Sequence, residues 1–139
     1  MLRFLEALRS ILGVETKAYG FTLVVWGTGS LTEAQRGKPG RLDVVAFVGG
    51  ALVALTLVIL VAFGGPRAPI PTRVRQRRHA LGAVHVVSVS IAMACGWVVA
   101  LVVTDTALSY LGASATAVLA YQLVVGLEGA LSTDRSEGA

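Results

Sequence analysis

The chain has 139 residues, of which 55% are hydrophobic and only 14% are charged, and its formal net charge is +4. Soluble globular domains carry about 25% charged residues, so this composition argues against a soluble domain and for a protein surrounded by lipid. The single cysteine, Cys95, excludes an intrachain disulfide and leaves the redox compartment undetermined.

Residues 1–13 form the first predicted element, an amphipathic helix. Apolar side chains recur at the spacing of one helical face and charged side chains fall on the other: Met1, Phe4, Leu5, Leu8, Ile11 and Leu12 against Arg3, Glu6 and Arg9. Such a helix lies in the membrane interface or packs against the protein's own helices, and the two placements are compatible.

Residues 18–31 are apolar but would extend only about 21 Å as a helix, which is short for a membrane span. The segment crosses the bilayer if its helix begins near Val14 and Lys17 extends its amine back to the interface. Otherwise it is a re-entrant segment or the apolar core of a signal peptide. Glu6 and Glu15 disfavour a signal peptide, which begins with basic residues.

Three later stretches carry no charge apart from His85: residues 44–63, 80–104 and 106–127. Each reaches the roughly 20 residues that a helix needs to cross the hydrocarbon core. One such stretch could be a buried helix of a soluble protein, but three in so short a chain cannot all be hidden. Asp43 precedes the first of these stretches and can cap its helix, and either Asp105 or Thr104 can cap the helix of the last one.

The positions of the basic residues predict the topology, because positive charges near membrane helices concentrate on the cytoplasmic side. If residues 18–31 span the membrane, nine Lys and Arg residues lie on one side of it and three on the other. If they do not, six basic residues lie on each side. We therefore predict an all-α integral membrane protein, a four-span helical bundle with spans near 14–32, 43–64, 80–104 and 106–128. Both termini, with a short polar tail over 129–139, are then cytoplasmic, and the Ala, Val and Arg usage suggests a bacterial inner membrane.

The loop "PRAPIPTRVRQRRHA", residues 66–80, holds five arginines and no acidic residue: Arg67, Arg73, Arg75, Arg77 and Arg78. We expect these arginines to fix the cytoplasmic side and to contact anionic lipid headgroups, each contributing about 1 kcal/mol. A specific acidic protein partner is the alternative. Nucleic acid is not a predicted partner, because no stacking aromatics or folded domain accompany the loop.

Small residues four apart mark helix-packing seams in membranes, and three of the spans carry them. The predicted seams are Ala46, Gly50 and Ala54; Ser88, Ala92, Gly96 and Ala100; and Gly112, Thr116 and Ala120. Four short spans have limited internal contact area. A homo-oligomer or a place in a larger membrane complex is therefore expected.

No catalytic, cofactor or metal site is predicted, and the chain is not expected to be an enzyme. Cys95 and His85 lie ten positions apart, about 15 Å along one helix, and cannot form a nucleophile and base pair. His85 lies inside a predicted span, either as a proton carrier or cavity-lining group or as a neutral imidazole bonded to a neighbour.

The sequence thus favours a small, non-enzymatic, polytopic membrane protein that acts by helix packing, as a self-associating module or an accessory subunit of a membrane complex. The alternative is a homo-oligomeric channel or transporter for a small ion or solute. Its lining would come from polar residues within the spans: Thr22, Thr28, Ser30, Thr56, His85, Ser88 and Gln122.

Overall fold

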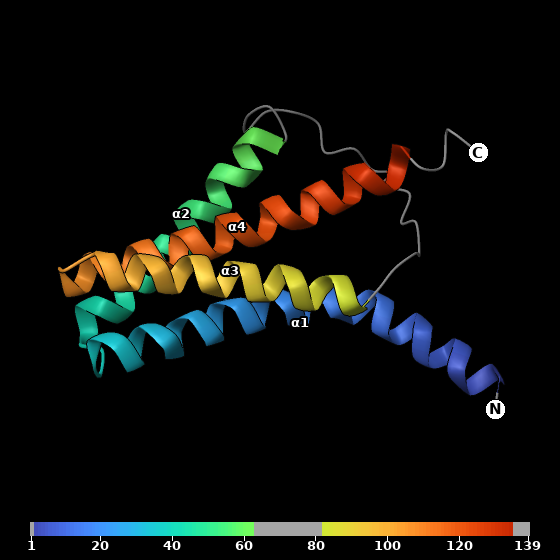
Figure 1. The fold of residues 1–139 in the computed structure, drawn as a ribbon, viewed down its shortest axis with the longest axis horizontal. Coiled ribbons are helices and arrows are strands. Elements are labelled where there is room, and N and C mark those ends of the chain that lie inside the picture. Colours follow the sequence, from blue (N-terminus) through green and yellow to red (C-terminus); the bar gives the residue numbers. More distant parts are fainter. Residues whose placement is uncertain (1, 63–81, 135–139) are drawn as a thin grey trace.

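The computed structural model describes residues 2–62 and 82–134, and there the chain is all-helical, with four α-helices (Figure 1). They are α1 (Leu2–Arg36), α2 (Arg41–Ala62), α3 (Gly82–Val102) and α4 (Thr106–Asp134). Side chains are described for residues 19–62 and 86–127. Within these ranges two helical stretches are long and apolar enough to cross a membrane, Arg41–Ala62 and Thr106–Leu127, while Val86–Val102 is apolar but shorter.

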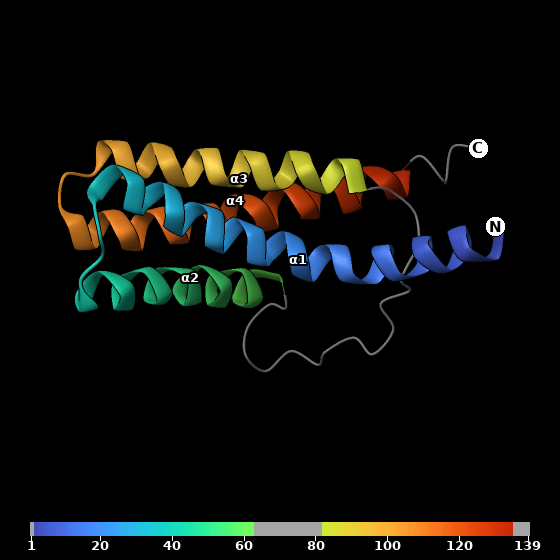
Figure 2. The same cartoon turned by 90° about the horizontal axis from the view of Figure 1, so that it is seen from below.

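α1, α3 and α4 run up and down along a common axis, and α2 is inclined to them (Figure 1). Short turns join α1 to α2 and α3 to α4 at the same end (Figure 2). α4 packs against all three other helices, and α1 also packs against α3. α2 packs mainly against α4 and lies at the edge of the bundle (Figure 2). The bundle is therefore three mutually packed helices with a fourth attached to one side.

Two predicted boundaries differ from the structure. The sequence predicts a separate helix over residues 1–13, whereas α1 continues from Leu2 to Arg36 without a break. The stretch contains no proline, and Gly13, although a poor helix former, keeps its N–H and leaves the hydrogen-bond ladder intact. The sequence also predicts a polar tail from residue 129, whereas α4 extends to Asp134. Polarity alone does not end a helix.

The turn between α1 and α2 is shaped by a glycine in the left-handed region. α1 ends at Arg36, and Gly37 has φ +84° and donates its N–H to the carbonyl oxygen of Glu33 at 2.7 Å. Residues with a Cβ rarely adopt this conformation, which satisfies a terminal carbonyl and redirects the chain. The chain therefore turns away from α1 within a few residues.

The two expected aspartate caps act differently. Asp105 Oδ1 accepts the Leu108 N–H at 2.9 Å, which confirms Asp105 as the N-cap of α4. α2 begins at Arg41, two residues before Asp43, and the Asp43 carboxylate instead reaches back to accept the Gly40 N–H at 2.8 Å. This is the backward bond that an acidic residue makes from the third position of a helix.

Small residues line the contacts of α3 and α2. Ser88, Ala92, Gly96 and Ala100 are all buried along one side of α3, and Gly50 and Ala54 are the buried residues of α2, with Ala46 half-buried. A Cβ on Gly96 would lie 2.7 Å from Thr28 Cγ2 and 2.9 Å from the carbonyl oxygen of Ala113. α1, α3 and α4 therefore meet here without space for another atom.

α1 carries a seam that the sequence patterns did not identify. Gly20, Val24, Thr28 and Thr32 are buried at every fourth position of the helix. Val24 interrupts the small-residue pattern, and in the sequence the polar residues of the segment predict a cavity lining and not a seam.

α4 buries a wider face than its small residues indicate. Gly112, Thr116 and Ala120 are only half-buried, although a Cβ on Gly112 would lie 3.0 Å from Val99 Cγ1. The larger side chains of Tyr110, Val118 and Tyr121 are buried as well. The buried residues of α4 are Ser109, Tyr110, Ala113, Ser114, Ala117, Val118 and Tyr121. A helix that packs against three neighbours buries more than one stripe, so residue size alone does not reveal its most buried face.

The outer surface of α2 is apolar and exposed. From residue 44 to residue 62 the helix has no charged residue, yet only Gly50 and Ala54 are buried. Val45 is 68% exposed and Val61 83% exposed, and Leu52, Val53 and Ile59 are also exposed. In water such a continuous apolar surface is unfavourable, which makes lipid or another apolar surface its natural surroundings.

Neighbouring glycines of α2 allow a matched test of the α2–α4 contact. A Cβ on Gly50 would collide with the carbonyl oxygen of Leu111, a backbone atom that cannot rotate away, whereas a Cβ on Gly49 meets nothing within 4 Å. We expect Gly50→Ala to destabilise the protein by about 1–3 kcal/mol through overpacking. Gly49→Ala should leave stability unchanged or raise it by up to about 1 kcal/mol, because alanine favours helix. Unfolding of the two variants in detergent tests this, and equal stabilities would contradict the packing described here.

Candidate functional site

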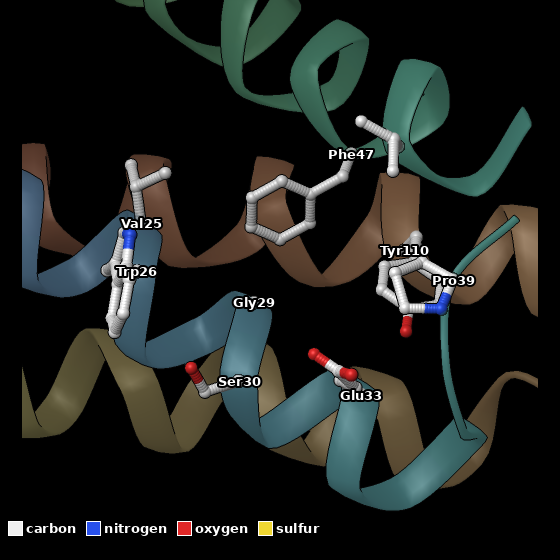
Figure 3. A pocket seen from close by; sticks show the side chains of 9 residues that line it. Val25, Trp26, Gly29, Ser30, Glu33, Pro39, Phe47 and Tyr110 are labelled. Atoms are coloured by element: carbon white, nitrogen blue, oxygen red, sulfur yellow. The ribbon is translucent and has the colours of Figure 1, made fainter. Parts of the chain in front are cut away.

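A cleft lies between α1 and α2, the two helices that do not pack closely against each other. Its first cavity has a volume of about 310 Å³ (Figure 3) and is lined from α1, the turn, α2 and α4 by Val25, Trp26, Gly29, Ser30, Glu33, Pro39, Val44, Phe47 and Tyr110. A second cavity of about 220 Å³ is lined by Phe21, Val25, Phe47, Val48, Ala51, Leu52 and Leu55. Because the cavities share Val25 and Phe47, we treat them together as the α1–α2 cleft.

Aromatic residues line the first cavity of the cleft. The rings of Phe47 and Tyr110 pack edge to face, with centroids 6.3 Å apart and planes at 77°. Tyr110 is buried, and its hydroxyl donates to the carbonyl oxygen of Gly37 at 2.9 Å. A Cβ on Gly29 would lie 3.4 Å from Phe47 Cζ, so the bare glycine backbone leaves room opposite this ring.

Polar groups in the cleft are few and gather on the α1 side. Glu33 is the only charged residue among those that line the two cavities, and both Glu33 and Ser30 are exposed. Figure 3 shows Glu33 near Tyr110 and Pro39 at one end of the first cavity, with Trp26 at the other end. The cleft therefore combines a large apolar lining with a single carboxylate.

Arg36, three residues beyond Glu33, binds the end of another helix. Its Nε donates to the carbonyl oxygen of Ala100 at 2.9 Å, and its Nη2 donates to the carbonyl oxygens of Leu101, at 3.4 Å, and Val103. The last carbonyls of a helix lack partners within the helix and form its negative end, so a guanidinium there satisfies both needs. The guanidinium of Arg36 is therefore bound to the carbonyl oxygens at the end of α3.

Two of the candidate pore-lining residues, Thr28 and Ser88, lie in the packed core. Thr28 is fully buried beside Gly96 and Ser88 is also fully buried. The Thr28 hydroxyl has no hydrogen-bond partner in the structure, while its carbonyl oxygen accepts from Thr32 Oγ1 at 2.8 Å. These hydroxyl residues occupy positions where small side chains allow close helix contact, and they do not border a passage.

The other candidates are dispersed. Ser30 lines the first cavity, Thr22 and Thr56 are exposed, and Gln122 is half-buried. The Thr56 hydroxyl donates to the carbonyl oxygen of Leu52 at 2.8 Å, within its own helix. His85 belongs to α3, but its side chain lies outside the described part of the chain, as do the loop arginines Arg67, Arg73, Arg75, Arg77 and Arg78. The described candidates therefore do not line a common cavity.

Most of the cleft was not predicted, because its residues come from four separate segments. Of its lining, only Ser30 is among the candidate site residues named from the sequence. The clearest available signal is the stretch "WGTGSLTE", residues 26–33, where two glycines, an aromatic residue and a carboxylate fall within two helical turns. Among the described side chains, no group of three or more His, Cys, Asp or Glu is placed to hold a metal ion.

The interaction of Arg36 with α3 can be tested by removing its charge. We expect Arg36→Gln to lower the free energy of unfolding by about 1–3 kcal/mol, because hydrogen bonds to charged groups contribute more than neutral ones. Amide hydrogen exchange near Val103 should accelerate as the end of α3 loosens. Lys38→Gln is the matched control, since Lys38 is exposed on the same turn. If both variants behaved alike, the Arg36 contact would have no special role.

The α1–α2 cleft is thus an apolar, aromatic-lined cavity with one carboxylate, positioned by a turn that Arg36 and Tyr110 attach to the rest of the bundle. Comparison with protein-family models, with curated proteins and with solved structures found no match to this chain.

Proposed function

We propose that this chain is a multi-pass membrane protein that acts without catalysis, by packing its helices against other copies of itself or against the subunits of a larger membrane complex. One observation carries the proposal. α2 is uncharged from residue 44 to residue 62 and leaves nearly all of its large apolar side chains exposed. Lipid tails and apolar helices are the surroundings in which that surface is stable.

The arrangement of the helices supports four membrane crossings. The helices alternate in direction, α1 and α3 one way and α2 and α4 the other, although α2 is inclined to the rest (Figures 1 and 2). Crossings by all four would therefore return the C-terminus to the side of the N-terminus. The nine-to-three division of basic residues favours the cytoplasm for that side. We assign the protein to a bacterial cell membrane, with the arginine loop against anionic headgroups.

The one-sided attachment of α2 supports association rather than conduction. α2 packs mainly against α4, so large apolar side chains such as Val45 and Val53 face away from the bundle. Membrane helices associate by close packing of such surfaces and by hydrogen bonds between helices. The bundle interior at Gly96, by contrast, is closed by Thr28 and Ala113.

The proposed topology predicts which sites are reachable from outside the cell. In a Cys95→Ser background, Lys38→Cys should react with a membrane-impermeant maleimide added to intact cells. Lys38 belongs to the turn between α1 and α2, at the other end of the bundle from the start of α1 and the end of α4 (Figure 2). Ser136→Cys should react only after the membrane is opened. Equal labelling of both positions in intact cells would contradict the topology. Replacing the five loop arginines with glutamine should then mix or invert the pattern.

The packing role predicts an assembly. After gentle extraction into detergent, the 14.4 kDa chain should be recovered as a multiple of its own mass or with a stoichiometric partner. Light scattering that separates protein from detergent mass provides the measurement, and mass spectrometry identifies any partner. A strictly monomeric species without a partner, obtained across several mild detergents, would overturn this role.

A further inference from the structure

We propose that the α1–α2 cleft binds a lipophilic organic cation, with the positive charge facing Glu33 and the apolar part against Val25 and Phe47. This inference is independent of the packing role, because it depends on the cleft and not on the outer surface of α2. Its basis is the combination of cavity size, aromatic lining and a single carboxylate.

The size and lining of the cleft suit a small apolar molecule. Sites for small molecules have volumes of about 300–1,000 Å³ and are mainly apolar with a few polar groups, which describes the first cavity of about 310 Å³. The second cavity borders the first at Val25 and Phe47 and is lined only by apolar side chains. It adds apolar surface next to the place proposed for the apolar part of the ligand.

The charge of the cleft selects a cation. Glu33 is the only charged residue in the lining, and Arg36, the nearest cation along α1, donates to three carbonyl oxygens at the end of α3. Lys38, Arg41 and Asp43 occupy the same end of the bundle but do not line either cavity. A carboxylate beside apolar walls attracts a cation and repels an anion more strongly than it would in bulk water.

The aromatic side chains strengthen this preference. Trp26, Phe47 and Tyr110 all line the first cavity, and aromatic ring faces attract cations, tryptophan most strongly. Trp26 is 76% exposed, so its ring is available at the cavity mouth (Figure 3). Aromatic rings together with one carboxylate form the arrangement that recognises organic ammonium and phosphonium groups.

A free cation fits the cleft better than a membrane phospholipid. A phospholipid carries its phosphate close to the headgroup amine, so binding the amine at Glu33 would place a negative phosphate near the same carboxylate. Two acyl chains also occupy far more volume than the cavities provide. A compact molecule with one positive charge meets neither difficulty.

The test compares two probes of nearly the same shape and opposite charge, tetraphenylphosphonium and tetraphenylborate. The full chain is purified in a non-ionic detergent, and binding is measured by equilibrium dialysis against protein-free micelles. We expect saturable binding of tetraphenylphosphonium and no saturable binding of tetraphenylborate. Equal binding of the two probes, or binding of neither, would overturn the proposal.

Single substitutions test the contribution of the Glu33 carboxylate and the contribution of the cavity space separately. Glu33→Gln should raise the Kd for tetraphenylphosphonium about tenfold or more, because it removes the facing charge. Asp105→Asn removes a carboxylate at the same end, outside the lining, and keeps a side chain that can cap α4. It should leave the Kd within about twofold, a change well under 1.4 kcal/mol. Gly29→Leu keeps Glu33 but fills the space opposite Phe47, and it should abolish saturable binding.

Circular dichroism in the same detergent verifies that each variant keeps its helices. Retained affinity in both Glu33→Gln and Gly29→Leu would show that the probe binds elsewhere and would reject the cleft as the site.

A competition experiment distinguishes a free cation from a lipid: added phosphatidylethanolamine should not displace the phosphonium probe. Displacement at a lipid-to-protein ratio near one would identify a lipid site and overturn the assignment to a free cation.

Discussion

The close approach of α3 and α4 at Gly96 determines much of the rest of the structure. A methyl group there would lie 2.9 Å from the carbonyl oxygen of Ala113, so only glycine lets the two backbones come this near. Gly50 makes a similar contact between α2 and Leu111 of α4. α4 can therefore contact all three other helices. α2 is left attached mainly on one side, with an exposed apolar surface and a cleft beside α1.

The two short turns at one end of the bundle are joined by polar bonds rather than by apolar packing. Arg36, at the end of α1, binds the last carbonyls of α3, and Tyr110, near the start of α4, binds the carbonyl of Gly37 in the other turn. Tyr110 also lines the α1–α2 cleft, where its ring packs against Phe47. Any movement that opens the turns must therefore also change the cleft.

The exposed face of α2 and the cleft suit different kinds of binding partner. The face consists of aliphatic side chains without charge and suits lipid or another helix, as proposed for the packing role. The cleft adds aromatic rings and Glu33, which an aliphatic contact would leave unused. An assembly on the outer face of α2 and a small cation in the cleft are compatible, because Val45, Val53 and Val61 are exposed without lining the cleft. Leu52 borders both.

The sequence by itself determined the all-helical class and the approximate positions of α2, α3 and α4, because apolar run length and proline positions act locally. It narrowed the cap of α4 to Thr104 or Asp105, and the structure shows Asp105 in that role. The sequence did not reveal the continuity of α1, the seam through Thr28 or the residues around Glu33 in the cleft. Thr28 looks like a polar residue available to line a pore, and only its position against Gly96 makes it part of the core. Tertiary structure decided these features because they depend on which helices pack together, and helical periodicity cannot specify a neighbour when a helix is apolar all round.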